Sequence, residues 1–352
     1  MRYGSNIDPP NPFDRHQREK DLEHVADDLD YLASLEKREV IYLDDDSQSI
    51  VSQNQSPDVP FRYSINPYRG CLHGCSYCYA RPGHEYLNMN AGLDFETKIM
   101  VKRNAPALFR QFLRRKNWRP EPITFSGVTD CYQPIERQLE LTRKCLEIAV
   151  ECRQPVSIIT KNALITRDQD LLESLAADRL VHVYLSITTL QPALAAVMEP
   201  KTSTPVARLR TLKELSQRGI PVGVMVAPVI PGLNDSEIPQ ILQAAAEAGA
   251  QSAGYVLLRL PTTVEPVFLE WLQRTHPDQA SKILHRIEET RGGKRNDASW
   301  DQRMSGQGLI AQQIRSLFQV FRRKTKLDQT MPSHNCDSFQ PPAKDDGQLR
   351  LF

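Results

Sequence analysis

Residues 66–82 read NPYRGCLHGCSYCYARP, and this stretch decides how the whole chain is interpreted. It places Cys71, Cys75 and Cys78 in a loop with two glycines, directly after a short run of strand-forming residues. Three thiolates at this spacing can reach three corners of one iron–sulfur cube, whereas such clusters are commonly held by four cysteines. With three, one iron keeps an exchangeable position, as the metal of a catalytic site does. We therefore predict a [4Fe–4S] cluster on these three cysteines.

A structural zinc site is the alternative interpretation, with His73, His84 or Cys131 as the fourth ligand. Such sites usually contain two Cys-x2–4-Cys pairs set apart in the sequence, and the second pair is missing here. On that interpretation the chain is a non-catalytic module that binds zinc or nucleic acid. Metal analysis separates the two interpretations, because the cluster contains iron and sulfide and the zinc site contains zinc.

The composition is that of an ordinary soluble globular protein, with 352 residues of which 40% are hydrophobic and 25% charged. No apolar run approaches the ~20 residues that span a bilayer, and the start, MRYGSNIDPP, lacks the pattern of a secretory signal. Seven cysteines, three of them within eight residues, favour a metal site in a reducing compartment over a disulfide scaffold. We therefore expect a cytoplasmic protein with no membrane partner.

Between residues 61 and 260, short β-branched runs alternate with amphipathic helical stretches. Alternation repeated about six times is typical of a parallel sheet, open or curled into a partial barrel, with functional residues at the carboxyl ends of its strands. A further run, DFETKIMVK (94–102), is expected to lie beside the first unit as an edge strand. The predicted strands are RYSIN (62–66), ITFSGV (123–128), VSIIT (156–160), VHVYLSI (181–187), VGVMVAPV (222–229) and AGYVLL (253–258).

The remaining segments differ in composition from this core. Residues 1–60 are acidic and polar, and we expect a partly disordered extension with a linker at 44–58 and a short helix at 21–37. Residues 261–326 have the pattern of a helical cap, and residues 327–352 that of a loose polar tail.

The cysteine motif resembles that of the radical S-adenosylmethionine (SAM) enzymes, whose hallmark is Cys-x3-Cys-x-aromatic-Cys at the end of the first barrel strand. Tyr77 occupies the aromatic position of this motif, and the resemblance makes it a candidate for cofactor binding. The resemblance covers roughly residues 61–260. Within that superfamily the chain is similar to the spore photoproduct lyase-like branch. It is also similar to an uncharacterised bacterial family that shares NPYRGC…CYAR.

The resemblance implies an α/β fold, a partial (β/α)6 TIM-like barrel with an acidic N-terminal extension and a helical C-terminal cap. It also implies two cofactors, a [4Fe–4S] cluster and SAM, and an electron donor such as flavodoxin or ferredoxin. In such enzymes the reduced cluster donates an electron to SAM, which breaks into methionine and a 5′-deoxyadenosyl radical that abstracts hydrogen from the substrate. The sequence does not identify the substrate. Nucleic acid is the leading class, narrowly above a peptide or a small molecule.

At the end of the second predicted strand, in SGVTD (126–130), the resemblance places small residues around the methionine part of SAM. Ser126, Gly127 and Thr129 are the candidates, and Asp130 lies at the carboxyl end of the strand. An ordinary strand-to-loop turn is the alternative interpretation. The Gly-Gly-Glu form of this segment, common elsewhere in the superfamily, is absent.

Four further SAM-binding candidates follow from the same resemblance. Lys161 follows the third predicted strand, where a lysine would pair with the SAM carboxylate. Ser186, Glu199 and Arg208 match a Ser…Glu…Arg pattern in the lyase-like branch, where the serine reaches SAM and the ion pair fixes the pocket. The alternatives are a solvated lysine and a surface ion pair, which contributes little to stability.

Cys131 follows the second strand at the expected mouth of the barrel, where a thiol could return hydrogen to a substrate radical. In the lyase-like branch the donor cysteine lies elsewhere, at the position that Gly127 occupies here, so the lyase reaction itself is not implied. Of the other cysteines, we expect Cys145 and Cys152 to be buried on one helix and Cys336 to be incidental.

Charge is unevenly distributed along the chain. Residues 1–60 contain fourteen acids and six bases, whereas VKRNAPALFRQFLRRKNWR (101–119) contains seven bases and no acid. A second basic region covers residues 282–326. If the two basic regions form one face, that face could bind nucleic acid, with Tyr79 and Tyr132 stacking on a base. Solvated helix faces are the alternative interpretation.

Overall fold

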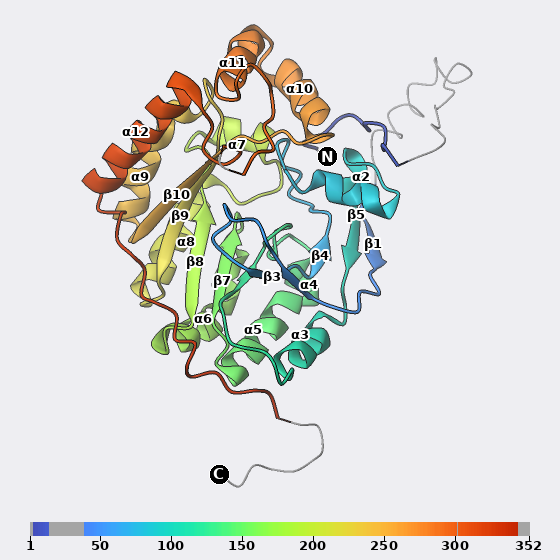
Figure 1. Cartoon of the computed structure of the whole chain (residues 1–352), viewed down its shortest axis with the longest axis vertical. Helices are drawn as coiled ribbons and strands as arrows, with labels where there is room; N and C mark the ends of the chain where they lie inside the picture. Colours follow the sequence, from blue (N-terminus) through green and yellow to red (C-terminus); the bar gives the residue numbers. More distant parts are fainter. Residues whose placement is uncertain (1–2, 14–38, 301, 344–352) are drawn as a thin grey trace.

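The computed structural model describes residues 3–13, 39–300 and 302–343 (Figure 1). Within these residues, the largest sheet has seven strands in the order β10-β9-β8-β7-β6-β3-β2. β2 runs antiparallel to β3, and every other neighbouring pair is parallel. β2 and β10 are its two edges, so the sheet is not closed. The strands are β2 (Val51–Gln53), β3 (Tyr63–Ile65), β6 (Ile123–Phe125), β7 (Val156–Thr160), β8 (Val181–Ser186), β9 (Val222–Val229) and β10 (Ser252–Leu257).

The predicted parallel α/β fold is therefore confirmed, and all six predicted core strands are present. β7 and β9 begin and end at the predicted residues, because both are runs of β-branched and small apolar side chains. β6 is shorter than predicted and ends at Phe125. Ser126 has a φ of 68°, a left-handed conformation that a strand cannot continue through.

Helices lie around the outside of this sheet (Figure 1). Local sequence sets their ends, as in α8, where the Thr204 side chain accepts a hydrogen bond from the Ala207 amide and Pro205 is the first helical residue. No described helix is long and apolar enough to cross a membrane. The helices around the sheet are α3 (Ala105–Leu113), α4 (Glu136–Leu139), α5 (Leu141–Cys152), α6 (Gln169–Ala177), α7 (Pro192–Met198), α8 (Pro205–Gln217), α9 (Ile238–Glu247), α10 (Val264–Thr275), α11 (Pro277–Glu289) and α12 (Gly308–Lys324).

The main hydrophobic core fills the space between the sheet and α3, α5, α6, α8, α9 and α12, while α7, α10 and α11 contribute to a second core. Cys145 and Cys152 are both buried in it from α5, as predicted for small apolar residues. The segment predicted as a helical cap, residues 261–326, contains α10, α11 and α12. Within the described residues, short 3-10 helices connect some of these elements: η2 (Arg81–Leu87), η3 (Ala163–Asp168) and η4 (Asp235–Glu237).

The segment 94–102 differs from its prediction as a single edge strand. Its first part forms α2 (Leu93–Thr97), and its second part forms β5 (Lys98–Val101). β5 is the central strand of a separate small sheet, between β1 (Ile41–Asp44) and β4 (Tyr68–Arg69). The prediction was wrong because the partners of β5 come from segments that showed no strand pattern of their own.

Two segments expected to be irregular are ordered against the core. The predicted linker 44–58 contains β2 and the buried side chain of Ile50. The helix predicted at 21–37 lies outside the described residues. In the predicted loose tail, residues 327–343 lie against the sheet and the end of α5. His182 Nε2 of β8 donates to the Pro332 carbonyl at 2.8 Å, and the Gln340 amide donates to the Cys152 carbonyl of α5 at 2.8 Å.

Candidate functional site

The three motif cysteines lie in a loop built from consecutive tight turns. The Gly74 amide donates to the Cys71 carbonyl (3.2 Å), the Cys78 amide to the Cys75 carbonyl (3.3 Å) and the Arg81 amide to the Cys78 carbonyl (3.3 Å). Gly74 has a φ of 64°, which glycine adopts at no steric cost. These turns hold the three cysteines together at the carboxyl end of β3, where the sequence predicts the site.

The chemistry of this loop fits a group that binds thiolates. Burial raises the pKa of each of the three thiols, and neighbouring charges, the other cysteines among them, raise the pKa of Cys71 and Cys75 further. Three thiolates so close together need a cationic group to stabilise them, and metal binding deprotonates such thiols. Across the described ranges, no three His, Cys, Asp or Glu side chains meet where one metal ion could be held. An iron–sulfur cluster is larger than a single ion, and its fit to this site rests on the three thiols of the loop.

The buried side chain of Arg81 anchors this loop through hydrogen bonds and an ion pair. Arg81 Nε and Nη2 donate to the Cys75 carbonyl at 3.1 and 2.8 Å, and Nη1 donates to the carbonyls of Ala91 and Gly92. Nη2 also bonds Glu96 Oε1 at 2.5 Å, and both side chains are fully buried. Sequence reasoning missed this pair, because no periodic pattern relates a motif-flanking arginine to an acid fifteen residues later.

Residues 3–11, which we name the N-terminal strap, pack over the same loop. The amides of Gly4 and Ser5 donate to the two Glu96 oxygens at 3.0 and 2.8 Å. The approach is so close that a Cβ on Gly4 would lie 1.6 Å from the Gly74 carbonyl oxygen. Only glycine at this position allows the strap to lie on the cysteine loop without displacing it.

Five predicted site residues meet around one buried carboxylate, that of Glu199. The hydroxyl of Tyr77 and the guanidinium of Arg208 both donate to it. Arg208 Nη1 also donates to the Ser186 carbonyl at 2.8 Å, and Lys161 Nζ lies 5.8 Å from the centroid of the Tyr77 ring. The structure therefore brings together Tyr77, Lys161, Ser186, Glu199 and Arg208.

The Glu199–Arg208 pair is buried, so its interpretation as a surface ion pair is wrong. Burial alone would raise the pKa of Glu199, but the charges of Arg208 and Lys161 outweigh burial and hold that pKa below its ordinary value. Burial and the nearby negative charges of Cys75 and Glu199 raise the pKa of Tyr77 well above its usual range. Glu199 is thus an anion and Tyr77 a neutral hydrogen-bond donor beside the cysteine loop.

The candidates after β6 shape the turn in which they lie. Ser126 Oγ accepts from the Cys131 amide at 2.8 Å, and the Thr129 hydroxyl donates to the Tyr68 carbonyl at 2.7 Å. The carbonyl of Gly127 accepts from the Tyr79 hydroxyl at 2.9 Å, which joins this turn to the cysteine loop. The hydroxyls of Ser126 and Thr129 are therefore already engaged within the protein.

Asp130 connects this turn to Lys161. Its Oδ1 accepts from the Thr160 hydroxyl at 2.7 Å, and its Oδ2 accepts from the Lys161 amide at 2.8 Å. His73 Nδ1 lies 3.4 Å from Asp130 Oδ2, and burial lowers the pKa of this histidine. Asp130 therefore fixes the backbone from which Lys161 projects.

The three candidates for a fourth zinc ligand have other partners. His73 lies against Asp130, and His84 Nε2 donates to the Lys98 carbonyl at 2.8 Å. Cys131 is fully buried in the main core, and that burial raises the pKa of its thiol well above the ordinary value. Cys131 therefore lies in the core and not at an open mouth.

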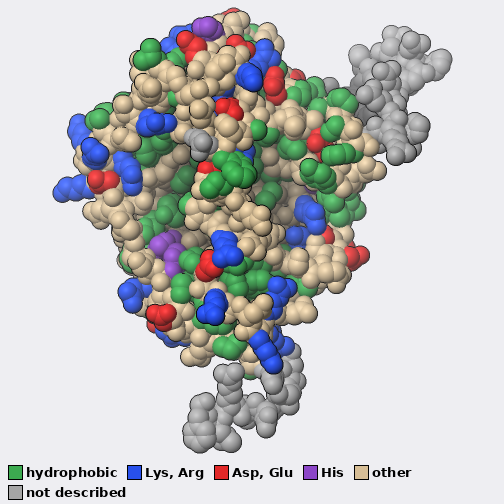
Figure 2. All heavy atoms as spheres, viewed as in Figure 1, with side chains coloured by type: hydrophobic (Ala, Val, Ile, Leu, Met, Phe, Trp, Pro, Cys, Tyr) green, Lys and Arg blue, Asp and Glu red, His purple; other side chains and the backbone are tan. Residues whose placement is uncertain are grey.

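The basic stretches do not form one face, contrary to the possibility raised from sequence. α3 lies at the lower right of Figure 1, away from α11 at the top and α12 at the upper left, and Lys and Arg side chains are scattered over the face in Figure 2. Arg110 of α3 pairs with Glu151 at 2.5 Å. Tyr132 is fully buried and cannot stack on a base, whereas Tyr79 is 49% exposed.

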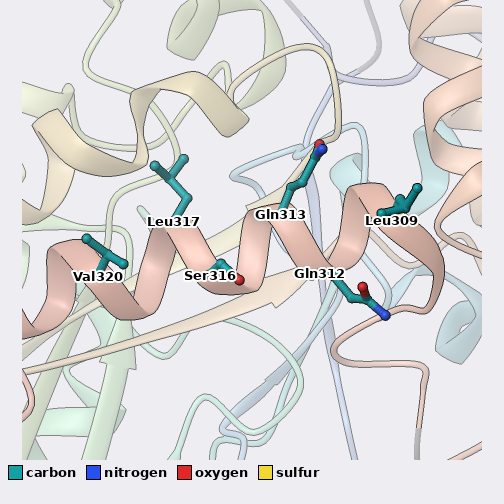
Figure 3. A pocket seen from close by; sticks show the side chains of 6 residues that line it. All are labelled: Leu309, Gln312, Gln313, Ser316, Leu317 and Val320. Carbon is teal, nitrogen blue, oxygen red and sulfur yellow. The ribbon is translucent and has the colours of Figure 1, made fainter.

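A shallow groove of about 460 Å³ lies on α12. All of its lining side chains project from this one helix (Figure 3), and none of them is charged. They are Leu309, Gln312, Gln313, Ser316, Leu317 and Val320. This groove therefore contributes nothing to the chemistry of the cysteine loop.

Residues 65–245 match the family described as the Radical SAM superfamily. An uncharacterized protein of Mycobacterium tuberculosis is 40% identical over 226 residues, which are 64% of this chain and 66% of that protein. An uncharacterized protein of Methanocaldococcus jannaschii is 34% identical over 176 residues, 50% of this chain and 63% of that protein. The chain thus spans just under two thirds of the length of these relatives.

Among solved structures, spore photoproduct lyase complexed with dinucleoside spore photoproduct has a similar fold. Its TM-score is 0.56 at 15% identity, with 81% of this chain and 79% of that chain covered. A variant of the same enzyme with bound AdoMet and dinucleoside spore photoproduct gives a TM-score of 0.54 at 15% identity, over 81% and 79% of the two chains.

Removing one partner of the buried ion pair should destabilise the fold. We expect Arg208→Ala to lower the free energy of unfolding by about 3–5 kcal/mol, because Glu199 would remain as a buried, unpaired charge. Arg210→Ala is the matched control on the same helix, since Arg210 is exposed and pairs weakly with Glu214 at 3.7 Å. Its effect should stay within about 0.5 kcal/mol. Urea unfolding followed by circular dichroism measures both free energies. Equal effects of the two substitutions would contradict the conclusion that the Glu199–Arg208 pair is buried.

Proposed function

This chain belongs to the radical SAM superfamily, and we propose that it abstracts hydrogen from a substrate by radical chemistry. It is an enzyme, and its cofactors are a [4Fe–4S] cluster and SAM. Bound together, these cofactors supply the reductive cleavage of SAM to a 5′-deoxyadenosyl radical. The alternative of a non-catalytic zinc or nucleic-acid module is not favoured, because the family match covers the cysteine motif.

The proposal assigns the cluster to Cys71, Cys75 and Cys78. Its main support is that three thiols, those of Cys71 and Cys75 buried and that of Cys78 half-buried, share one loop. Arg81 holds the central carbonyl of this loop, that of Cys75, with two hydrogen bonds. Burial excludes water from this loop and strengthens every electrostatic interaction within it. The loop lies at the carboxyl ends of the parallel strands, and we propose that these strands form the partial (β/α)6 barrel.

For SAM, the proposal divides the surrounding residues into contacting and positioning groups. Lys161 is half-buried and supplies a cation for the SAM carboxylate. Glu199 already accepts hydrogen bonds from Tyr77, Thr188 and Arg208, so it positions those side chains and does not contact SAM itself. Ser126, Gly127, Thr129 and Ser186 offer small side chains and backbone groups at the ends of β6 and β8.

We also propose an electron donor, a location and a substrate class for this enzyme. An electron donor such as flavodoxin or ferredoxin would reduce the cluster, and reduced thiols favour a cytoplasmic location. Nucleic acid stays the leading substrate class, supported by the dinucleoside that the structurally similar lyase binds and by the exposed ring of Tyr79 beside the loop. We also propose that the N-terminal strap limits access of oxygen to the cluster.

The cysteine assignment predicts a sharp difference between variants. Cys75→Ala should abolish dithionite-dependent formation of 5′-deoxyadenosine and lower the content of about four irons per chain, because only three thiolates hold the cluster. Cys336→Ala is the control, since Cys336 lies in the tail, and it should keep both properties. Anaerobic reconstitution with iron analysis and chromatography of the products measures them. Full SAM cleavage by Cys75→Ala would contradict the assignment.

The role of Lys161 predicts a loss of SAM affinity without loss of iron. Lys161→Met should raise the Kd for SAM roughly tenfold to a hundredfold, because a charge-assisted hydrogen bond contributes about 1.5–3 kcal/mol. Lys213→Met, on the exposed face of α8, is the control. Equilibrium dialysis on reconstituted protein measures both. An unchanged Kd in Lys161→Met would remove this residue from the SAM site.

The shielding role of the strap predicts that Gly4→Ala shortens the lifetime of the cluster in air. Its Cβ would collide with the Gly74 carbonyl and displace the strap, whereas Gly83→Ala adds a Cβ with nothing within 4 Å. We expect the decay of cluster absorbance in air to accelerate severalfold in Gly4→Ala alone. Equal decay rates in both variants would mean that the strap does not protect the cluster.

A further inference from the structure

Arg259 lies two residues after β10, at the carboxyl end of the sheet and beside the cysteine loop. Its guanidinium carbon is 5.8 Å from the centroid of the Tyr79 ring. Tyr79 directly follows Cys78, and its hydroxyl donates to the Gly127 carbonyl at 2.9 Å. Ligands of open parallel α/β sheets bind at this end of the strands. Arg259 and Tyr79 therefore lie where a substrate would approach the proposed cluster.

Arg259 has no acidic partner among the described residues. Its one hydrogen bond runs from Nη1 to the Met304 sulfur at 3.8 Å, and its Nε is buried without a partner. The adjacent Arg303 differs, because Asp58 accepts from both its Nε and its Nη2 at 2.5 Å. Arg303 is thus paired with a carboxylate within the protein, whereas Arg259 has a donor, its Nε, without a partner.

A second guanidinium adds to this positive charge. Arg291 is 2% exposed and donates to the carbonyls of Gln302 and Leu258 at 2.8 and 2.6 Å, and its Nε also lacks a partner. Burial, with Arg259 contributing, lowers the pKa of Arg291 to about 10. Burial and the charge of Arg303 likewise lower the pKa of Arg259, and the facing acids are Asp58 and Asp297.

Burying cationic groups with too few acids costs free energy unless an anion completes the site. A guanidinium presents several N–H donors in a planar fork that matches the oxygens of a phosphate. The exposed ring of Tyr79 next to it offers a flat surface on which a planar group can stack. These two features select a ligand that carries both a phosphate and an aromatic ring.

We propose that Arg259 and Tyr79 form a substrate subsite for a phosphate ester that carries a planar ring, a nucleotide unit. Arg259 binds the phosphate, and Tyr79 supports the ring one residue from the cluster ligand Cys78. Arg291 acts behind them as a positioning residue, because its Nη groups are held by backbone carbonyls. This inference rests on the proposed function, since it names the substrate class of the same site.

The test measures the affinity of three probes for the full-length, reconstituted, SAM-bound enzyme by calorimetry: uridine 5′-monophosphate, uridine and inorganic phosphate. The uracil ring keeps the probe distinct from the adenine of SAM. Wild-type enzyme should bind the monophosphate more tightly than either fragment. Arg259→Gln should weaken monophosphate binding at least tenfold, toward the affinity of uridine, and Tyr79→Leu should weaken it toward the affinity of phosphate.

Arg295→Gln is the matched control, because Arg295 pairs with Glu265 and Glu288 at 3.1 and 3.0 Å, and monophosphate affinity should not change in it. Tighter binding of a short oligouridylate than of the monophosphate would identify a polynucleotide as the source of the unit, and equal binding a free nucleotide. Equal monophosphate affinity in wild type and Arg259→Gln overturns the inference. The inference is also overturned if Arg259→Gln loses as much affinity for SAM as for the monophosphate, because Arg259 would then belong to the SAM site.

Failure of the proposed function is visible separately in the same preparation. Wild-type enzyme that forms 5′-deoxyadenosine with dithionite and binds no probe would overturn the nucleotide subsite alone. Probe binding that depends on Arg259, in an enzyme that never cleaves SAM, would overturn the radical function and leave the subsite standing.

Discussion

The buried guanidinium of Arg81 connects the three segments on which the candidate site depends. It binds the carbonyl of Cys75, the turn at residues 91–92 and the carboxylate of Glu96. Glu96 in turn accepts the amides of Gly4 and Ser5. Because both charges are removed from water, either one alone would be costly, and the pair is stable only when all of these segments are in place.

A second buried carboxylate, that of Glu199, performs the same task on the other side of the cysteine loop. Tyr77, the aromatic residue within the motif, donates to it, and Arg208 extends from it to the end of β8. The loop is therefore held between two buried ion pairs, one toward α2 and the strap and one toward the sheet. Such fixed dipoles and charges suit radical chemistry, in which the protein positions reactive groups and excludes water.

Sequence reasoning succeeded where the chain carries a local or repeated pattern. The runs at 156–160 and 222–229 became strands at the predicted residues, because their many β-branched side chains favour an extended, pleated backbone. Tyr77, Glu199 and Arg208 were predicted as site residues from sequence motifs and their spacing, and they contact one another in the structure.

Where sequence reasoning failed, the determining contacts are long-range. β5 was misplaced because its partner β1 lies more than fifty residues earlier and has no strand pattern beyond four residues. The tail after Leu327 was expected to be loose, yet it is fixed by hydrogen bonds to backbone carbonyls such as that of Cys152, which no side-chain pattern reveals. Arg81 and Arg259 were missed for a related reason, because their importance comes from what surrounds them and not from their spacing.

The central claim is that three cysteines hold a cluster whose fourth iron is left for SAM. Mössbauer spectroscopy of protein reconstituted with iron-57 tests this most directly, with spectra recorded before and after SAM is added. The account predicts one iron site whose parameters change on SAM addition, while the three cysteine-bound irons stay nearly the same. Four irons that all remain unchanged when SAM binds would contradict it.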